Sequence, residues 1–396
     1  MPANLDSITF LTGDFDILFP KGMVKVLPPF SETAITFLEK LSKEILKDSR
    51  TKNFSDVTSY AFWIRKASIE KNKQFLNINT NRIGRGIAFH IAPSNVPVNF
   101  AVSFTYSLLA GNMNIVRVSN KNFEQVNIIC DSINKICKQI TEIKNLVNVI
   151  RYEHNEEITQ AISDICDIRV VWGGNNTINS IRKAQLPPRA IELTFADRHS
   201  FLIINADKYL QMNPDEIAQR FYIDTYYTDQ NACSSPRLVV WTGSNTKKAK
   251  EIFWNSLEKL VKNKYSLTDI QAVDKLDKFC QFAISHKKIK IIQKSNYLLR
   301  VEINEVFEDL MDFKGNSGYF YEYSTNNLFD LSPLLTKPCQ TISYCGIEKK
   351  LIRDFIFKLG CVGVDRIVEI GKTMEESFIW DGYNMIEAMS RIIYLR

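Results

Sequence analysis

A long stretch without charged side chains constrains the fold of this chain most strongly. Between Ile87 and Val116 there is no Asp, Glu, Lys or Arg. A membrane-spanning helix would need about 20 consecutive apolar residues, but His90, Pro93, Asn95 and Pro97 interrupt this stretch. Two prolines so close together break a continuous helix. The stretch therefore predicts a buried strand, a polar loop and a buried helix, and no membrane span.

Strands and helices are expected to alternate around this stretch. Short apolar runs bounded by turn residues predict buried strands, and longer runs with apolar residues at helical spacing predict helices. The expected strands cover residues 86–91, 115–118, 147–150 and 168–172, and the expected helices cover 99–110, 119–140 and 156–166. Such alternation with buried strands is typical of an α/β fold with a doubly wound parallel sheet.

A second α/β unit is expected to begin near residue 200. Strands are predicted at 191–195, 200–204 and 238–241, and helices at 214–227 and 247–261. Residues 1–80 are expected to be largely helical, with helices over 31–46 and 59–75. The length of 396 residues suits two such domains.

The composition argues against several classes of protein. The net charge of +6 comes from 50 basic and 44 acidic side chains, with no basic cluster interleaved with aromatic residues, so nucleic-acid binding is not expected. No two histidines have the spacing of metal ligands, so no metal site is expected. The eight cysteines form no C-x-x-C pair, and the N-terminus lacks the pattern of a signal peptide. These features predict a reduced, cytoplasmic protein.

Cys233 is a candidate nucleophile. It lies in residues 229–236 (DQNACSSP), whose polar side chains predict an accessible loop rather than a core position. A cysteine near oriented amides or a helix terminus can have a lowered thiol pKa. The alternative is an inert free cysteine, which the local pattern taken alone favours.

Two further loops are candidates for ligand binding. Asn95 lies between Pro93 and Pro97, which hold its loop extended, and a rigid amide donor suits an oxyanion hole. The alternative is an ordinary strand-to-helix turn. Gly173 and Gly174 follow a predicted strand, where backbone amides can approach a phosphate. They do not form the G-x-G-x-x-G fingerprint of dinucleotide sites.

One carboxylate and two histidines are also candidates. Glu192 lies inside an apolar strand, where it is either a proton-transfer group or a strand-end residue that faces solvent. His90 lies in an apolar strand and is expected to be a hydrogen-bonded core residue. His199 follows a predicted turn, and the sequence leaves open whether it belongs to the surface or to a site.

The order of these motifs resembles the aldehyde dehydrogenase superfamily. More narrowly, the chain resembles the acyl-CoA reductase family typified by the fatty-acid reductase subunit of bacterial bioluminescence. The segments that carry the resemblance are APSNVP (92–97), LAGN (109–112), VWGG (171–174), ACSSP (232–236), QTI (340–342) and WDG (380–382). They run from about residue 83 to the C-terminus.

The resemblance implies a fold and a domain organisation. It implies an α/β, aldehyde dehydrogenase-like fold with two Rossmann-like doubly wound domains and a small oligomerisation tail. The expected domains are a nicotinamide cofactor-binding domain over 1–198, a catalytic domain over 199–368, and a C-terminal tail over 369–396 that makes subunit contacts. A homo-oligomer is therefore expected.

The resemblance also implies roles for particular residues. Cys233 matches the nucleophile that forms an acyl thioester, Asn95 the side chain that holds the oxyanion, and Glu192 the glutamate that activates water. Arg117 takes the place of a lysine that binds the adenosine ribose or its phosphate, and an arginine suits a 2′-phosphate. The residues implied to bind NADP(H) are Pro93, Ser94, Arg117, Ser119, Gly173, Gly174 and Thr177.

The expected function is therefore NADPH-dependent reduction of an acyl thioester, fatty acyl-CoA or acyl-protein, to the aldehyde through a cysteine acyl-enzyme. An acyl-protein synthetase is an expected partner, and the acyl chain length stays open. The alternatives are a hydrolytic NAD(P)-dependent aldehyde dehydrogenase and a non-catalytic acyl-carrying subunit. The chain departs from the superfamily's Glu-Leu-Gly-Gly, because Thr194 and Phe195 follow Glu192 and Leu193. The lost glycines count against the hydrolytic alternative.

Overall fold

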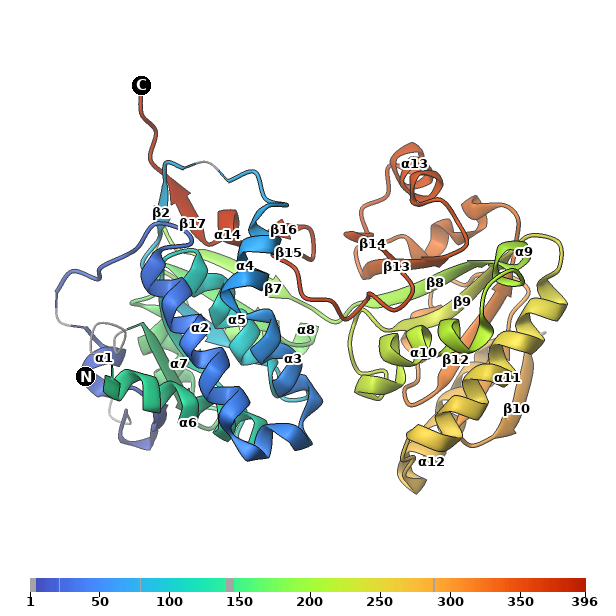
Figure 1. The fold of residues 1–396 in the computed structure, drawn as a ribbon, viewed down its shortest axis with the longest axis horizontal. Coiled ribbons are helices and arrows are strands. Elements are labelled where there is room, and N and C mark those ends of the chain that lie inside the picture. The colour runs from blue at the N-terminus through green and yellow to red at the C-terminus, as the bar shows by residue number, and fades with distance from the viewer. Residues whose placement is uncertain (1–4, 21, 79, 140–145, 288) are drawn as a thin grey trace. The chain divides into compact units, whose positions relative to one another are not determined.

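Two sheets of mostly parallel strands form the framework of the protein in this computed structural model, which describes residues 5–20, 22–78, 80–139, 146–287 and 289–396 (Figure 1). The chain divides into two units. The first comprises Met1–Ala196 and Glu376–Arg396, and the second comprises Asp197–Glu375. Residues 376–396 thus pack with the first unit, whereas the sequence-based expectation grouped 369–396 as a C-terminal tail and put the first boundary at 198/199.

The first sheet has the strand order β1-β5-β4-β3-β6-β7. Its strands are β1 (Thr9–Thr12), β3 (Ile87–Ile91), β4 (Met113–Arg117), β5 (Val147–Arg151), β6 (Ile168–Trp172) and β7 (Ile191–Phe195). All neighbouring strands are parallel except the β1–β5 pair. The chain adds β4 and β5 on one side of β3, and then β6 and β7 on the other. Ligands of doubly wound sheets bind at the carboxyl ends of the strands beside such a reversal.

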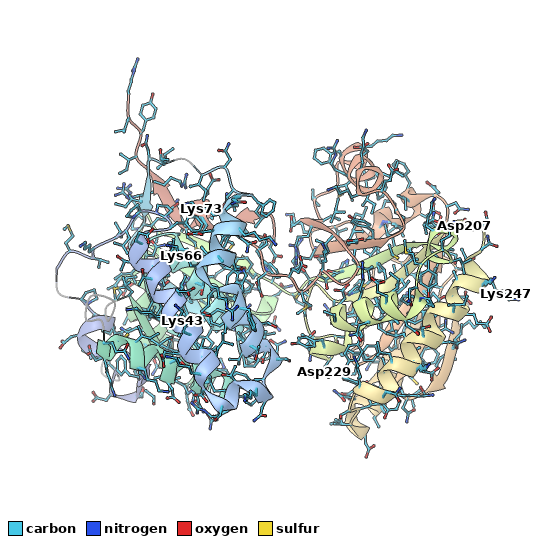
Figure 2. The ribbon with its side chains drawn as sticks, in the orientation of Figure 1. Lys43, Lys66, Lys73, Asp207, Asp229 and Lys247 are labelled. Carbon is cyan, nitrogen blue, oxygen red and sulfur yellow. The ribbon has the colours of Figure 1, made fainter. Side chains whose placement is uncertain are left out.

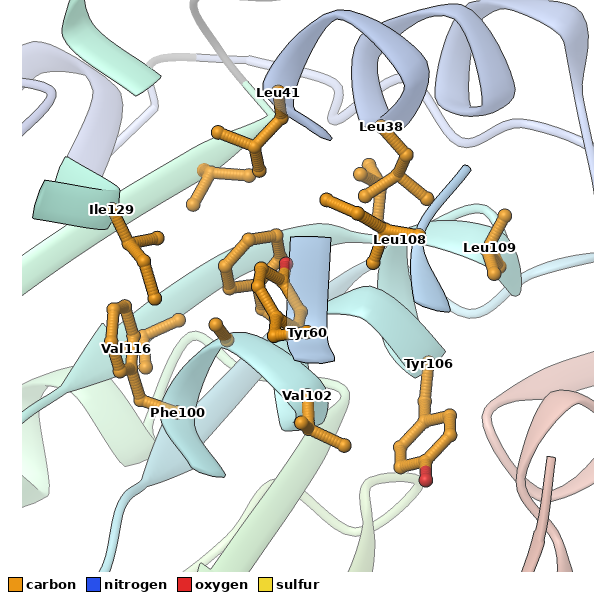
Figure 3. Close-up of a cluster of buried hydrophobic side chains, with 14 of the residues drawn as sticks. Leu38, Leu41, Tyr60, Phe100, Val102, Tyr106, Leu108, Leu109, Val116 and Ile129 are labelled. Atoms are coloured by element: carbon orange, nitrogen blue, oxygen red, sulfur yellow. The ribbon is translucent and has the colours of Figure 1, made fainter. Parts of the chain in front are cut away.

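Helices cover both faces of the first sheet. On one face lie α2 (Glu32–Lys47), α3 (Ser55–Trp63), α5 (Asn99–Leu109) and α6 (Glu124–Gln139). On the other lie α7 (Glu156–Ser163) and α8 (Asn175–Ile181). Figure 3 shows the core under the first group, where Ile129 of α6 points toward Val116 of β4 and Leu38 of α2 lies beside Leu108 of α5. The doubly wound arrangement predicted from the alternation of elements is confirmed.

The charge-free stretch forms β3, a loop over 92–98, α5 and β4. All side chains of β3 are buried, and so are ten of the eleven residues of α5. A helix that is apolar all round must be covered all round, and α5 lies against β3, β4, α2 and the short C-terminal α14 (Met385–Ala388). The predicted strand, loop and helix are confirmed. No helix among the described residues is long and apolar enough to cross a membrane.

The helix expected over 59–75 is wrong as a single element. It is divided into α3, which ends at Trp63, and α4 (Lys66–Lys73). Arg65 between them is extended, with φ −62° and ψ 143°. The following Lys66 N–H donates to Glu39 Oε2 of α2 (2.8 Å), so a contact with another helix replaces the intrahelical hydrogen bond.

The predicted starts of two other helices agree with the structure to different degrees. Ser31 caps α2, because its Oγ accepts from Ala34 N–H (3.3 Å), close to the predicted start. The helix expected over 119–140 begins only at Glu124. Ser119 instead lies in the turn after β4, where its Oγ accepts from Lys121 N–H (3.2 Å). Residue 140 lies outside the described residues.

The second sheet has the strand order β10-β11-β12-β9-β8-β13-β14. Its strands are β8 (His199–Asn205), β9 (Pro236–Thr242), β10 (Lys290–Ser295), β11 (Leu298–Glu302), β12 (Tyr319–Ser324), β13 (Cys339–Cys345) and β14 (Arg366–Glu369). Only the β10–β11 pair is antiparallel. One face carries α9 (Ala206–Tyr209), α10 (Pro214–Asp224) and α11 (Thr246–Lys264), and the other carries α12 (Asp269–Ser285) and α13 (Lys349–Leu359).

Short elements complete the first unit. They are α1 (Phe15–Leu18), β2 (Arg82–Gly84), β15 (Ile379–Trp380), β16 (Tyr383–Asn384) and β17 (Ser390–Ile392). β17 pairs antiparallel with β2, so the end of the chain joins a strand that precedes β3. Phe378 packs its ring against Phe30, Trp63 and Tyr106, with centroids 5.5 to 6.3 Å apart. The C-terminal segment is therefore part of the first core.

Candidate active site

Cys233 lies in a turn that the second sheet holds in place. A backbone hydrogen bond of 3.0 Å closes the turn between residues 232 and 235. Ser200 Oγ donates to Cys233 O (2.8 Å) and accepts from Thr341 N–H (3.1 Å), so β8 and β13 both support the turn. The turn leads directly into β9 at Pro236. Cys233 is thus half-buried at the amino ends of three neighbouring strands.

Three ionisable side chains belong to the surroundings of Cys233. Asp197 Oδ1 is 4.0 Å from Cys233 Sγ, and Lys314 Nζ donates to Asp197 Oδ2 (2.7 Å). Arg237 is buried at the start of β9. Burial lowers the pKa of Arg237 to about 10, while negative charge on Cys233 and Asp197 acts in the opposite direction. One carboxylate and two cations therefore lie near the candidate nucleophile.

The two candidate histidines are both buried and neutral at pH 7. His90 contacts Ser103 Oγ (2.7 Å) and Asn114 Oδ1 (3.1 Å), and burial lowers its pKa to about 4. It is a hydrogen-bonded core residue, as predicted. His199 Nε2 lies 3.3 Å from Leu334 O, and burial likewise lowers its pKa to about 4. Within the described residues, no group of three or more His, Cys, Asp and Glu side chains could hold a metal ion.

The residues implied to bind the cofactor gather at the carboxyl edge of the first sheet. Pro93 and Ser94 follow β3, Arg117 ends β4 and precedes Ser119, Gly173 and Gly174 follow β6, and Thr177 lies in α8. Ile91 pairs with both Arg117 and Val171, so these strand ends are neighbours. Asn95 is exposed in the loop after β3. Gly174 has open space where a Cβ would lie, so a ligand can approach its backbone closely.

A groove of about 990 Å³ adjoins this edge between α7 and α8. Its charged lining residues are the cations Arg117 and Lys183 and the carboxylates Glu156, Glu157 and Asp164. The Arg117 guanidinium lies 4.5 Å from the centroid of the Tyr152 ring, and its Nη2 donates to Tyr152 O (3.3 Å). Arg117 Nε is buried and has no hydrogen-bond partner among the described residues. An orphaned cationic donor beside a groove fits a phosphate-bearing cofactor.

Glu192 is engaged by two arginines of its own unit. Its Oε2 accepts from Arg169 Nε (2.8 Å) and Nη2 (2.5 Å), and its Oε1 accepts from Arg182 Nε (2.7 Å). Arg169 lies opposite Glu192 on β6. Both carboxylate oxygens are therefore occupied by ion pairs, a partnership that the sequence did not reveal.

Comparison with known proteins identifies the family. The sequence profile of the acyl-CoA reductase (LuxC) family matches residues 22–392. The chain belongs to the LuxC acyl-CoA reductase family. The reductase is an oxidoreductase of that family, as the motif order predicted. A search of curated proteins gave no match.

The reductase also has the fold of solved aldehyde dehydrogenases. Lactaldehyde dehydrogenase from Escherichia coli matches with a TM-score of 0.63 and 12% identity, over 92% of this chain and 86% of that chain. A NAD-dependent benzaldehyde dehydrogenase from Corynebacterium glutamicum matches with a TM-score of 0.60 and 13% identity, over 90% of this chain and 82% of that chain. The predicted aldehyde dehydrogenase-like fold is confirmed. This fold, together with a reductase family, implies a nicotinamide cofactor.

Sequence reasoning missed several residues around Cys233. Arg237 had a local signal, because it is a charged residue at the start of an otherwise apolar strand that closely follows the candidate nucleophile. Lys314 and its partner Asp197 had none, since only the folded chain brings a loop before β12 to the start of β8. Arg169 could have been suspected as a charge in an apolar strand.

Proposed function

We propose that this reductase converts a fatty acyl-CoA or acyl-protein thioester into the aldehyde with NADPH, through an acyl thioester on Cys233. The observation that carries the proposal is the placement of Cys233. It is half-buried in a turn that Ser200 fixes at the backbone, in the company of Asp197, Lys314 and Arg237. A partly accessible thiol with cations nearby is the setting in which cysteine acts as a nucleophile.

Other cysteines of the second unit lie in a different environment. Cys339 and Cys345 are buried in β13, and burial raises the pKa of both thiols, that of Cys345 to about 12. Such thiols stay protonated and inert. The contrast supports Cys233 as the reactive cysteine.

The proposed reaction has two halves. In the first, the Cys233 thiol loses its proton, its sulfur bonds to the acyl carbonyl carbon, the carbon–sulfur bond to coenzyme A breaks, and the coenzyme A thiolate takes up a proton. NADPH, when bound, supplies the hydride that reduces the thioester on Cys233. Cys233 sulfur then leaves with the electron pair of its bond to carbon, is protonated again, and the aldehyde is released. The resemblance to the superfamily implies that the Asn95 amide and the Cys233 N–H stabilise the negative charge that develops on the carbonyl oxygen.

Water activation has no assigned group in this proposal. A hydrolytic aldehyde dehydrogenase needs a free carboxylate that takes a proton from water, whereas Arg169 and Arg182 occupy both oxygens of Glu192. The proposal therefore gives Glu192 a structural role in joining β6, β7 and the end of α8. This arrangement favours release of an aldehyde over hydrolysis of the acyl-enzyme.

We propose NADPH rather than NADH as the cofactor because of the position of Arg117. Its side chain borders the groove between α7 and α8 with a donor that has no partner among the described residues, whereas the other cation of the lining, Lys183, pairs with Glu156 (3.7 Å). A 2′-phosphate would meet a planar guanidinium that can bind two oxygens at once. An adenosine ribose without that phosphate would leave the donor without a partner.

Replacing Arg117 by methionine should raise the KM for NADPH and hardly change that for NADH. We expect an increase of roughly 10- to 100-fold, since hydrogen bonds to charged groups contribute about 1.5–3 kcal/mol. Steady-state kinetics with both cofactors measure it. Arg189→Met, which changes an exposed arginine of the same unit outside the groove, is the matched control. Equal losses with the two cofactors would contradict the assignment.

The proposed activity is tested by mixing the protein with NADPH and acyl-CoAs of several chain lengths. We expect oxidation of NADPH that depends on the thioester, measured by the absorbance of the reduced nicotinamide, with aldehyde captured by a hydrazine reagent. The acyl chain with the highest kcat/KM identifies the substrate length. Absence of thioester-dependent oxidation at every length, or an acid as the product, would rule out the proposal.

The proposed function also includes an oligomeric state, a partner and a cellular location. The C-terminal end exposes Ile392, Tyr394 and Leu395 beside β17, which supports a homo-oligomer that uses this segment. An acyl-protein substrate would require an acyl-protein synthetase as partner. All eight cysteines are free thiols, which supports a reducing, cytoplasmic location.

A further inference from the structure

The loop that leads to Cys233 contains two residues in a strained backbone conformation. Asp229 (labelled in Figure 2) and Gln230 both have left-handed φ values, 52° and 60°. Ser317, which faces them, has φ 55°, and its N–H donates to Asp229 O (3.0 Å). Left-handed backbone is unfavourable for residues other than glycine and persists only where the surroundings impose it. Interactions with the surrounding residues must therefore stabilise the conformation of this loop.

The side chain of Gln230 provides some of these stabilising interactions. Its side chain is fully buried, and its Oε1 accepts from Gly318 N–H (2.8 Å) and Tyr319 N–H (3.2 Å). Its Nε2 donates to Pro236 O and Tyr319 O, both at 3.1 Å. The amide thus makes four hydrogen bonds, which join both ends of the Cys233 loop to the segment 318–319.

The side chain of Arg237 provides others. Its buried guanidinium donates to Gln230 O, to Gly315 O and to Asn316 Oδ1. These three acceptors are uncharged, and a buried cation among neutral acceptors is costly unless negative charge lies nearby. The guanidinium bonds to the carbonyl that opens the Cys233 loop, and its own residue closes that loop.

The segment that receives these bonds is itself fixed. Lys275 of α12 donates from its buried Nζ to Ser317 O (2.7 Å), and Asn316 Nδ2 donates to Asn231 Oδ1 (2.8 Å). Gly318 has φ 94°, and a Cβ there would lie 2.3 Å from Tyr297 O. Residues 315–319 therefore form a rigid support beside the Cys233 loop.

We propose that Gln230 and Arg237 are positioning residues that clamp the Cys233 loop to residues 315–319, and that the Arg237 guanidinium also favours the Cys233 thiolate. The inference rests on the proposed role of Cys233 as the nucleophile. Two other charged groups face Cys233: Asp197, whose Oδ1 is 4.0 Å from Sγ and disfavours the thiolate, and Lys314, which pairs with that carboxylate. The charge of Arg237 stabilises the thiolate before acyl transfer and again when the sulfur leaves the reduced carbon. The four hydrogen bonds of Gln230 fix the ends of the loop that carries the sulfur.

The charge is tested by the pH dependence of Cys233 alkylation with iodoacetamide, measured by mass spectrometry on the peptide that contains Cys233. Arg237→Met should raise the midpoint by about one pH unit or more, because an opposite charge is lost. Arg237→Lys keeps the charge and should leave the midpoint near that of the unmodified protein. Asn316→Asp, which neutralises the guanidinium and retains an acceptor, should also raise it. Arg300→Met removes a guanidinium on β11, two strands away from β9 in the same sheet, and is the control.

The clamp is tested separately by Gln230→Ala. We expect kcat to fall about tenfold or more with KM little changed, since a displaced nucleophile loses its reactive geometry, while the alkylation midpoint stays unchanged. Unchanged midpoints in both Arg237→Met and Asn316→Asp would overturn the role of the charge, and full activity in Gln230→Ala would overturn the clamp. If Arg237→Met does not fold, Asn316→Asp decides the first point. Alkylation needs neither substrate nor NADPH, so its failure is distinguishable from failure of the proposed function.

Discussion

Replacing Cys233 by alanine is expected to remove acyl-CoA reduction almost completely, by at least about 10⁴-fold in kcat, as loss of a covalent nucleophile does. Without the thiol no acyl thioester forms, and the hydride has no enzyme-bound carbonyl to reduce. The turn itself should survive, because Ser200 holds the backbone carbonyl of residue 233 rather than its side chain. NADPH oxidation with the acyl-CoA of highest kcat/KM measures the loss.

Two cysteines of the same unit serve as controls for this result. Cys280 is exposed on α12, and Cys361 is half-buried after α13. Their replacement by alanine should leave kcat and KM unchanged. Full activity in Cys233→Ala, or an equal loss in either control, would contradict the assignment of the nucleophile.

Replacing Asn95 by alanine is expected to lower kcat by about 10²–10³-fold, the usual effect of removing one oxyanion donor. Its side chain is exposed in the loop after β3, so the change should not disturb the core. KM should change little, because the donor acts on charge that develops only in the transition state. Steady-state kinetics with saturating NADPH separate the two parameters.

The matched control for Asn95 is Asn122→Ala, which removes an exposed amide of the same unit in the turn before α6. We expect no loss of activity there. A rise in KM at constant kcat in Asn95→Ala would mean that this side chain binds substrate rather than stabilising the oxyanion. Unchanged kinetics would remove Asn95 from the site.

Much of the fold could be predicted because burial leaves a direct trace in the sequence. The stretch from Ile87 to Val116 has no charges because β3, α5 and β4 are covered on all sides. The break between α3 and α4 could not be predicted from the distribution of apolar and charged residues. It depends on the contact between Lys66 N–H and Glu39 of another helix, which no local pattern contains.

The candidate site was predictable where its residues belong to continuous motifs. Gly173, Gly174 and Arg117 follow or end strands, and parallel strands place those ends at one edge. The surroundings of Cys233 and Glu192 were not predictable. Lys314 reaches Asp197 only through the folded second unit, and the ion pairs of Glu192 depend on the register of β7 against β6.

The central claim is that an acyl group passes through Cys233 before it is reduced. The most direct measurement incubates the reductase with acyl-CoA in the absence of NADPH and analyses the tryptic peptide 221–237 by mass spectrometry. We expect this peptide to carry the mass of the acyl group on Cys233, and addition of NADPH to remove it with release of an equal amount of aldehyde. A peptide that stays unmodified while the enzyme is active, or an acyl group that NADPH does not discharge as aldehyde, would contradict the account.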